Sequence, residues 1–477
     1  MYRSSVYNLK KNFYSFCFFI STFPLIGLTY WYFLMDNTKM YFRFFYILKF
    51  FDVYIPIGLD GISFFFILLT SIIVPLCILY NIKINLLESE KIFYFSLFLL
   101  IEFLLIQIFL VLDLVWFYIL FELLLIPFYF LVAINNDLLI ATKKKVNRRL
   151  NAFLLLFFYT IVSSFFMLIS IILIYLLTGT TNIVILHFSY FNENVENFLW
   201  ICFFISFGIK IPILPFHLWL PEAHVESPTE VSVLLASIIL KVGAYGLLRI
   251  VLPVFTYSSV FYTDLVYVLC LFSCTYSSLS AISQTDIKRI MAYSSISHMN
   301  IGILGLFSFD LESICGAYIL FIGHGFVSGG LFFLIGMLYK RLGTKNTLHI
   351  RGLINLFPVF TCIFFLFILF NCSLPGTVNF IGEFLILKTG LSKNLFFFIF
   401  FIFISIFCTS IYNFILYNKS AYGVPYNIIK YSKDLTLLEF CVLLPLLLWI
   451  FFLGLHPNMV IDLINKDIIF ILYKNIY

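Results

Sequence analysis

Six ionisable side chains lie within apolar stretches of the sequence, and they are the residues best suited to chemistry. They comprise two carboxylic acids, two lysines and two histidines: Glu122, Lys210, Lys241, His298, His324 and Glu383. A charge at the centre of a bilayer costs about 2.5–3.5 kcal/mol even on lenient insertion scales. Burial disfavours the charged form of such a group, whereas a nearby opposite charge restores it. Groups that alternate between the two forms can pass protons, so these residues predict a proton path.

A break in the helical pattern follows Lys210. The segment Gly-Ile-Lys-Ile-Pro-Ile-Leu-Pro-Phe-His-Leu-Trp-Leu-Pro-Glu-Ala-His places Pro212 and Pro215 directly after the lysine. Proline removes a backbone donor and breaks a helix, and non-helical backbone at membrane depth is tolerated only where protein or water covers it. His217 and His224 flank the end of this segment, and we expect them to hold the broken helix and its loop.

A second break precedes Glu383. Its sequence is Leu374-Pro375-Gly376, and it lies five spans after the break at Lys210. This odd offset places the two breaks in repeats of inverted topology. Paired Gly/Pro-interrupted helices in corresponding positions indicate the binding site of a transporter.

Each candidate also has a structural interpretation. Glu122 and Lys210 stand on different spans, and their charges could form a static ion pair that fixes helix packing. His298 and His324 could be hydrogen-bonded core residues. Arg249 lies near the end of its span, which favours snorkelling to the membrane interface. Three further charges, on residues nearer span ends, are weaker candidates: Glu102, Asp113 and Lys388.

The composition is that of a polytopic membrane protein. Of 477 residues, 63% are hydrophobic and 11% are charged, against about 25% charged in soluble domains. The net charge of +6 comes from basic residues concentrated in short loops, which are typical topology signals; we expect no nucleic-acid partner.

The ten cysteines are scattered without a CxxC pair, so we expect neither a metal nor an iron–sulfur site. The glycines of 323–330 lie inside an apolar helix and favour close helix packing over dinucleotide binding.

Thirteen spans of about 20 apolar residues are predicted, at 13–35, 60–82, 92–111, 113–133, 151–178, 198–220, 230–252, 258–283, 287–308, 313–340, 355–385, 392–418 and 436–457. The aromatic, amphipathic segment 40–57 is placed at the membrane interface. Basic loops follow the fourth, eighth and tenth spans and therefore share one side. The expected fold is all-α, with about 13–14 transmembrane helices and two inverted repeats, each containing a broken helix. The expected division is 1–91 (N-terminal helices), 92–252 and 258–418 (repeats), and 419–477 (a loop and the last transmembrane helix).

Four long motifs resemble the antiporter-like membrane subunits of respiratory complex I. They are the segment 208–229, Leu240-Lys-Val-Gly-Ala-Tyr-Gly-Leu-Leu-Arg249, the segment 284–299, and Leu374-Pro-Gly-Thr-Val-Asn-Phe-Ile-Gly-Glu383-Phe. The resemblance extends from about residue 58 to 456. It implies that Glu122 and Lys210 form the coupling pair of a first half-channel, that Lys241, His298 and His324 form a central axis, and that Glu383 ends a second half-channel.

The resemblance also implies partners and a location. Sibling antiporter-like subunits 2 and 5 and membrane lipids would surround the chain, in the mitochondrial inner membrane. The 64 Phe and 30 Tyr codons fit an A/T-rich organellar genome. NADH, FMN, iron–sulfur clusters and ubiquinone would belong to other subunits, and this chain would bind no cofactor and no metal. It would act as one subunit of a proton-pumping oxidoreductase.

Two departures from the family and two alternatives remain. The family has fourteen spans against thirteen here, so an N-terminal helix is missing or reduced. Glu230 stands where the family has small residues, and its role is open. The chain could instead be a subunit of a multi-subunit cation/proton antiporter, or a purely structural membrane subunit. Because all six ionisable residues of the proton path are present, a loss of function is disfavoured.

Overall fold

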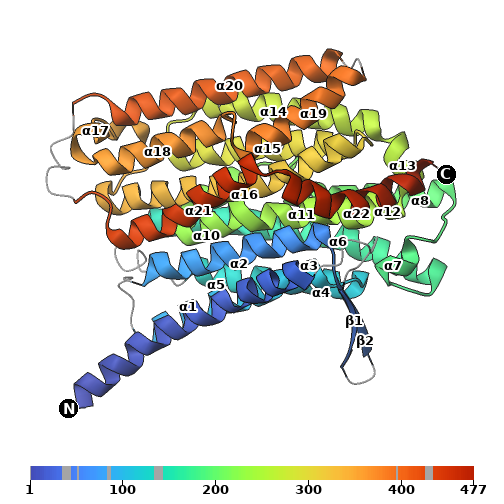
Figure 1. Cartoon of the computed structure of the whole chain (residues 1–477), viewed down its shortest axis with the longest axis horizontal. Coiled ribbons are helices and arrows are strands. Elements are labelled where there is room, and N and C mark those ends of the chain that lie inside the picture. The colour runs from blue at the N-terminus through green and yellow to red at the C-terminus, as the bar shows by residue number, and fades with distance from the viewer. Residues whose placement is uncertain are drawn as a thin grey trace.

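The computed structural model describes residues 2–34, 44–50, 53–82, 88–133, 143–393, 396–424 and 433–476. In these ranges the chain forms a bundle of roughly parallel and antiparallel helices with one β-hairpin (Figure 1). Nine helical segments of the described chain are long and apolar enough to cross a membrane. The predicted all-α, multi-pass architecture is therefore confirmed.

The elements follow one another in the order α1 (Tyr2–Leu34), β1 (Phe44–Phe50), β2 (Val53–Leu59), α2 (Gly61–Asn81), α3 (Glu88–Leu110), α4 (Leu114–Leu123), α5 (Leu125–Ala133), α6 (Lys143–Thr178), α7 (Ile183–Leu186), α8 (Glu193–Lys210), α9 (Trp219–Glu226), α10 (Thr229–Leu234), the π-helix η2 (Leu235–Ile239), α11 (Leu240–Gly246), the π-helix η3 (Leu247–Val251), α12 (Leu252–Val254), α13 (Thr256–Phe261), α14 (Thr263–Ser283), α15 (Ile287–Leu306), α16 (Leu311–Leu342), the 3₁₀-helix η4 (Thr347–His349), α17 (Leu353–Leu356), α18 (Pro358–Asn371), α19 (Val378–Ser392), α20 (Phe396–Ala421), α21 (Leu437–Leu455) and α22 (Asn458–Ile476). Each of the thirteen predicted spans coincides with one helix or with consecutive helices in this series.

The two broken helices run in opposite directions. The pair α8–α9 ends where the Val225 carbonyl accepts a hydrogen bond from Lys345. The pair α18–α19 begins near that end of the bundle, and its far end is joined to the start of α16 by the 2.6 Å ion pair of Lys388 with Glu312. This antiparallel arrangement is what inverted repeats require.

Basic side chains that follow the fourth, eighth and tenth predicted spans lie at one end of the bundle, which we call the basic end. Loops after α14 and α16 meet there through a bridge between Asp286 and Asn346, and Lys288 is within electrostatic reach of Arg149 and Lys345. The side chains of Lys143–Asn147 lie outside the described set. For the described residues, the predicted shared side is confirmed.

Two elements were not anticipated. Within segment 40–57, residues 44–50 and 53–59 form an antiparallel hairpin with Phe44 opposite Leu59 and Phe50 opposite Val53; residues 40–43 and 51–52 lie outside the described chain. The C-terminal region adds α22 after the last predicted span. Its Asp467 accepts the Gly61 N–H at 2.9 Å, which ties it to the start of α2, opposite the basic end. Asp462, Lys466 and Asp467 interrupt the apolar residues of α22, so span prediction passed over it.

Arg249 does not snorkel to the interface, so that prediction was wrong. The guanidinium is 2% exposed and pairs with the Asp60 carboxylate, which also caps the N-terminus of α2 through the Ser63 N–H at 2.8 Å. Packing between α2 and η3 brings a carboxylate to Arg249, and a buried pair replaces the solvent contact.

We expect Asp60→Ala to lower the free energy of unfolding by about 3–5 kcal/mol, because it removes the carboxylate paired with a buried guanidinium. Thermal unfolding of the purified protein would measure the change. The double variant Asp60→Ala/Arg249→Met, which removes both charges, should recover part of the loss. Equal stability of Asp60→Ala and the native chain would show that this pair does not hold α2.

Candidate proton path

Lys241 stands at the centre of the bundle between two π-helices. Its side chain is fully buried, and Nζ donates to the Ala236 carbonyl at 2.5 Å and lies 2.8 Å from His324 Nδ1. Ala236 belongs to η2, where the wider π turn displaces carbonyls from their α-helical partners. The π turn therefore offers the ammonium an acceptor within its own helix.

His324, His298 and Glu383 continue the line of polar groups from Lys241. The two imidazole centroids are 5.8 Å apart, and His298 Nδ1 lies 2.9 Å from a Glu383 carboxylate oxygen. The Nε2 atoms of both rings have no hydrogen-bond partner within the described chain. Transfer of a proton between the rings therefore needs a ring rotation or a bridging water. All four residues are nearly inaccessible to solvent.

Glycine residues allow α16 and α19 to pack closely enough for His324, His298 and Glu383 to lie near one another. A Cβ at Gly323 would come within 2.5 Å of Asn379 Oδ1, and one at Gly382 within 2.8 Å of the Gly316 carbonyl. The glycines beside His324 therefore serve helix packing, as the sequence indicated, and they bring α16 alongside Glu383.

Lys210 ends α8 at the first break. The indole N–H of Trp219 donates to the Ile209 carbonyl at 2.9 Å, and the Leu214 N–H donates to Ser273 Oγ at 3.0 Å. Protein groups thus satisfy backbone that Pro212 and Pro215 take out of the helix, as membrane depth requires.

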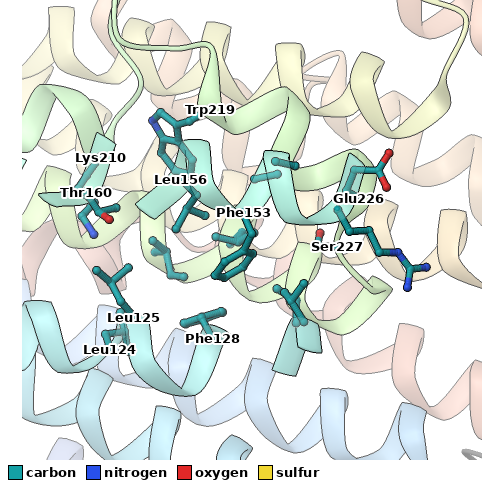
Figure 2. Close-up of a pocket in the computed structure, with 17 residues that line it drawn as sticks. Leu124, Leu125, Phe128, Phe153, Leu156, Thr160, Lys210, Trp219, Glu226 and Ser227 are labelled. Carbon is teal, nitrogen blue, oxygen red and sulfur yellow. The ribbon is translucent and has the colours of Figure 1, made fainter. Parts of the chain in front are cut away.

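A cavity leads from Lys210 toward the basic end (Figure 2). Its volume is about 20 Å³, enough for one water molecule. Figure 2 shows Lys210 and Thr160 at one side and Glu226 with Ser227 at the other. Apolar side chains such as Leu124, Phe153 and Leu156 line most of the wall between them. The cavity therefore has an amine at one side and polar groups near the basic end at the other.

Glu122 and Lys210 do not form a direct ion pair in this structure. The ammonium lies 4.0 Å from the ring centroid of Phe121, and the Glu122 Oε1 atom has no hydrogen-bond partner among the described residues. Glu122 nevertheless acts electrostatically on Lys210. The two side chains are thus neighbours whose direct contact would require movement of one or both.

The second break is supported like the first. The Asn379 amide donates a hydrogen bond to the Phe370 carbonyl at 3.3 Å. The Trp219 indole makes the equivalent hydrogen bond to a backbone carbonyl at the first break. Gly376, after Pro375, has φ +93°, a conformation that L side chains rarely adopt. Its carbonyl would lie 2.4 Å from a Cβ at Gly454, so α21 packs directly on this break.

The two histidines near the first break have different surroundings. His217 packs edge-on against Tyr276 with a centroid distance of 5.4 Å, and neither of its ring nitrogens has a hydrogen-bond partner among the described residues. His224 is fully buried and stacks on Phe332 at 4.6 Å. It also lies within electrostatic reach of Lys288 and Lys241, which places it between the basic end and the central line.

Lys288 and Glu230 are two buried charges at the basic end whose surroundings sequence reasoning missed. Lys288 is 1% exposed and donates to the Ser227 carbonyl at 2.8 Å, although its position in a basic loop indicated only topology. Glu230 is 4% exposed and acts on Lys288 and Lys340. Glu230 is therefore a counter-charge for two lysines at the basic end.

The described residues contain no group of three or more His, Cys, Asp or Glu side chains that could hold a metal ion. Lys210 and Lys241 lie on touching helices, since a Cβ at Gly243 would be 3.2 Å from Lys210 Cβ. The arrangement can hold and move protons between amines, imidazoles and carboxylates.

Comparison with known proteins decides the family. The family model described as "NADH:quinone oxidoreductase/Mrp antiporter, TM" matches residues 111–409. The chain belongs to this family. Among its relatives is NADH-ubiquinone oxidoreductase chain 4 of Chondrus crispus, which is 40% identical over 413 residues, or 86% of this chain and 81% of the relative. The protein of the same name from Acanthamoeba castellanii is 38% identical over 94% of this chain and 90% of its own.

Chains in two solved structures have the same fold. A chain of respiratory complex I from Thermus thermophilus superposes with a TM-score of 0.81 at 26% identity, covering 95% of both chains. A chain of the Mrp complex from Dietzia superposes with a TM-score of 0.85 at 18% identity, covering 97% of this chain and 93% of the other. The fold predicted from the family's motifs is thereby confirmed.

Proposed function

We propose that this chain is a proton-translocating membrane subunit of NADH:ubiquinone oxidoreductase in the mitochondrial inner membrane. The observation that carries the proposal is the buried line Lys241–His324–His298–Glu383, with contacts of 2.8 Å and 2.9 Å at its two ends. Relatives at 37–42% identity that are named chain 4 of this enzyme support the choice of complex.

In the first half-channel, a proton enters from the basic end through the cavity that reaches Lys210. Burial favours the neutral amine and Glu122 favours the ammonium. Movement of Glu122 toward or away from Lys210 therefore changes whether the amine holds its proton. Glu122 and Lys210 form no direct ion pair in the described structure. This arrangement suits two side chains that must come together and separate during proton transfer.

In the central part, Lys241 donates to His324 and becomes neutral. His324 then passes a proton toward His298, whose Nδ1 atom lies 2.9 Å from a Glu383 carboxylate oxygen. An imidazole suits this role because its ordinary titration lies near neutral pH. Glu383 gives the second half-channel a terminal acceptor on the helix that follows the second break.

Electron transfer would take place on other subunits. NADH, FMN, iron–sulfur clusters and ubiquinone would be bound there. The energy released by electron transfer would reach this chain through changes in the neighbouring membrane subunits. We expect the sibling antiporter-like subunits 2 and 5 beside it, together with membrane lipids.

A cation/proton antiporter subunit is the second candidate, because the Mrp chain shares the fold. A native gel of solubilised membranes, stained for NADH dehydrogenase activity and analysed for peptides of this chain, separates the two. We expect the peptides in the NADH-oxidising band. Their confinement to a smaller band without that activity would contradict the proposal, and sodium- or potassium-driven proton flux would then be the activity to assay.

We expect Glu383→Gln to slow NADH-driven proton uptake by about 100-fold or more, which is the lower end of the range for one positioned proton-transfer group. The glutamine can still accept a hydrogen bond from His298, so assembly should persist, but it cannot ionise. Proton uptake by the enzyme in sealed vesicles measures the effect. Glu383→Asp, which keeps a carboxyl group, should retain more activity than Glu383→Gln; equal rates in the two variants would contradict the role.

A further inference from the structure

Glu102 on α3 is a buried carboxyl group that the proton path does not use. Its side chain is 3% exposed, and its Oε1 atom has no hydrogen-bond partner among the described residues. None of the described basic side chains acts on it electrostatically. Burying such a group without a partner is unfavourable, so its presence calls for a function.

The carboxyl group lines a cavity of about 520 Å³ between α1 and α3. Glu102 is the one ionisable residue among the described residues that line it. The remaining lining residues are apolar or aromatic: Phe16, Phe19, Ile20, Phe23, Pro24, Leu99, Phe103 and Ile106. Three of them face outward, with Phe19 68%, Phe23 73% and Phe103 60% exposed. The cavity is therefore an open groove on the outer face of the bundle, with a single acidic group at its wall.

The depth of Glu102 limits what can reach it. Glu102 lies eight residues before the end of α3 at Leu110 and further from the start at Glu88, which places it about 12 Å or more from either end of the helix. A lipid headgroup remains at the interface, and an acyl chain has no hydrogen-bond donor. A transmembrane helix can bring both an apolar surface and a polar side chain to this depth, where buried ionisable groups pair with one another.

We propose that the groove between α1 and α3 is the docking site for a transmembrane helix of another chain, which places a basic side chain against Glu102. Charge complementarity selects this occupant: the groove offers one acid in apolar surroundings, and an amine, guanidinium or imidazole on a helix supplies the missing partner. The proposal needs only that the chain works in a multi-subunit membrane assembly, and it holds whichever complex the native gel identifies.

A structure of the intact assembly, solved by electron cryo-microscopy, tests the proposal directly. The expected result is a helix of another chain between α1 and α3, with a basic side chain within hydrogen-bond distance of Glu102. Lipid or detergent density in the groove would overturn the proposal. A helix that presents only apolar side chains to Glu102 would overturn it as well.

Substitutions on α3 test the same contact through their effect on assembly of the complex. Glu102→Leu should lower the fraction of the chain recovered in the intact assembly by at least about tenfold, as expected for loss of a hydrogen bond to a charged group. Gln107→Leu, a change of one polar side chain on the same helix outside the groove, is the matched control and should leave assembly unchanged. Normal assembly of Glu102→Leu would contradict the proposal. Proton pumping of the assembled fraction should be unchanged, which separates this contact from the proton path.

Discussion

Replacing Lys241 by alanine is expected to reduce NADH-driven proton uptake by about 100-fold or more. Its ammonium joins the Ala236 carbonyl to the His324 imidazole. Alanine leaves both groups without this partner and removes the amine that supplies the central line with protons. Proton uptake and NADH oxidation should be measured together in sealed vesicles, because their ratio separates lost coupling from lost turnover.

Lys388→Ala is the matched control for Lys241→Ala. Lys388 forms an ion pair with Glu312 whose two side chains are 53% and 50% exposed, and such surface pairs contribute little. We expect this variant to pump at the native rate. If Lys241→Ala, fully assembled, also pumped at the native rate, the central line would not carry protons.

Replacing Lys210 by alanine is the second change with a large expected effect. The amine is the innermost polar group of the cavity that opens toward the basic end, and alanine would leave the first half-channel without a proton carrier. We expect proton uptake to fall by about 100-fold. Assembly should be preserved, since Trp219 and Ser273 still hold the break.

Lys210→Arg distinguishes proton transfer from charge pairing. Arginine keeps the positive charge beside Glu122 but does not release its proton at ordinary pH. If Lys210 passes protons, the arginine variant should be as inactive as the alanine variant. Native proton uptake by Lys210→Arg would show that only the fixed charge matters, and the static ion-pair interpretation of this residue would then apply.

The membrane spans, the two helix breaks and the motifs of the family could be predicted from the sequence because each depends on residues that are close together in the chain. A run of about 20 apolar residues is long enough to cross the bilayer, and the pair Pro212 and Pro215 and the pair Pro375 and Gly376 each group helix-breaking residues within such a run. The six ionisable residues were found for the same reason, since a charge in an apolar run is visible without coordinates. The amphipathic α22 and the hairpin were missed because neither carries a continuous run of about 20 apolar residues.

The partners of those charges were decided by tertiary structure. Sequence periodicity gives the face of a helix on which a residue lies but neither the neighbouring helix nor its rotation. Arg249 therefore looked free to snorkel, until the packing of η3 against the start of α2 brought Asp60 to it. Conversely, Glu122 and Lys210 looked like a pair, yet Phe121 is the group that covers the ammonium.

The sequence by itself determined which ionisable residues lie within apolar spans. Only the folded bundle decided their order: Lys241 meets His324, and His298 meets Glu383. The physical reason is that these contacts join α11, α15, α16 and α19, and their spacing depends on glycines such as Gly323 that let helix backbones approach. Such approach distances, and the π turn that gives Lys241 its acceptor, arise from packing between helices and have no signature within any single one.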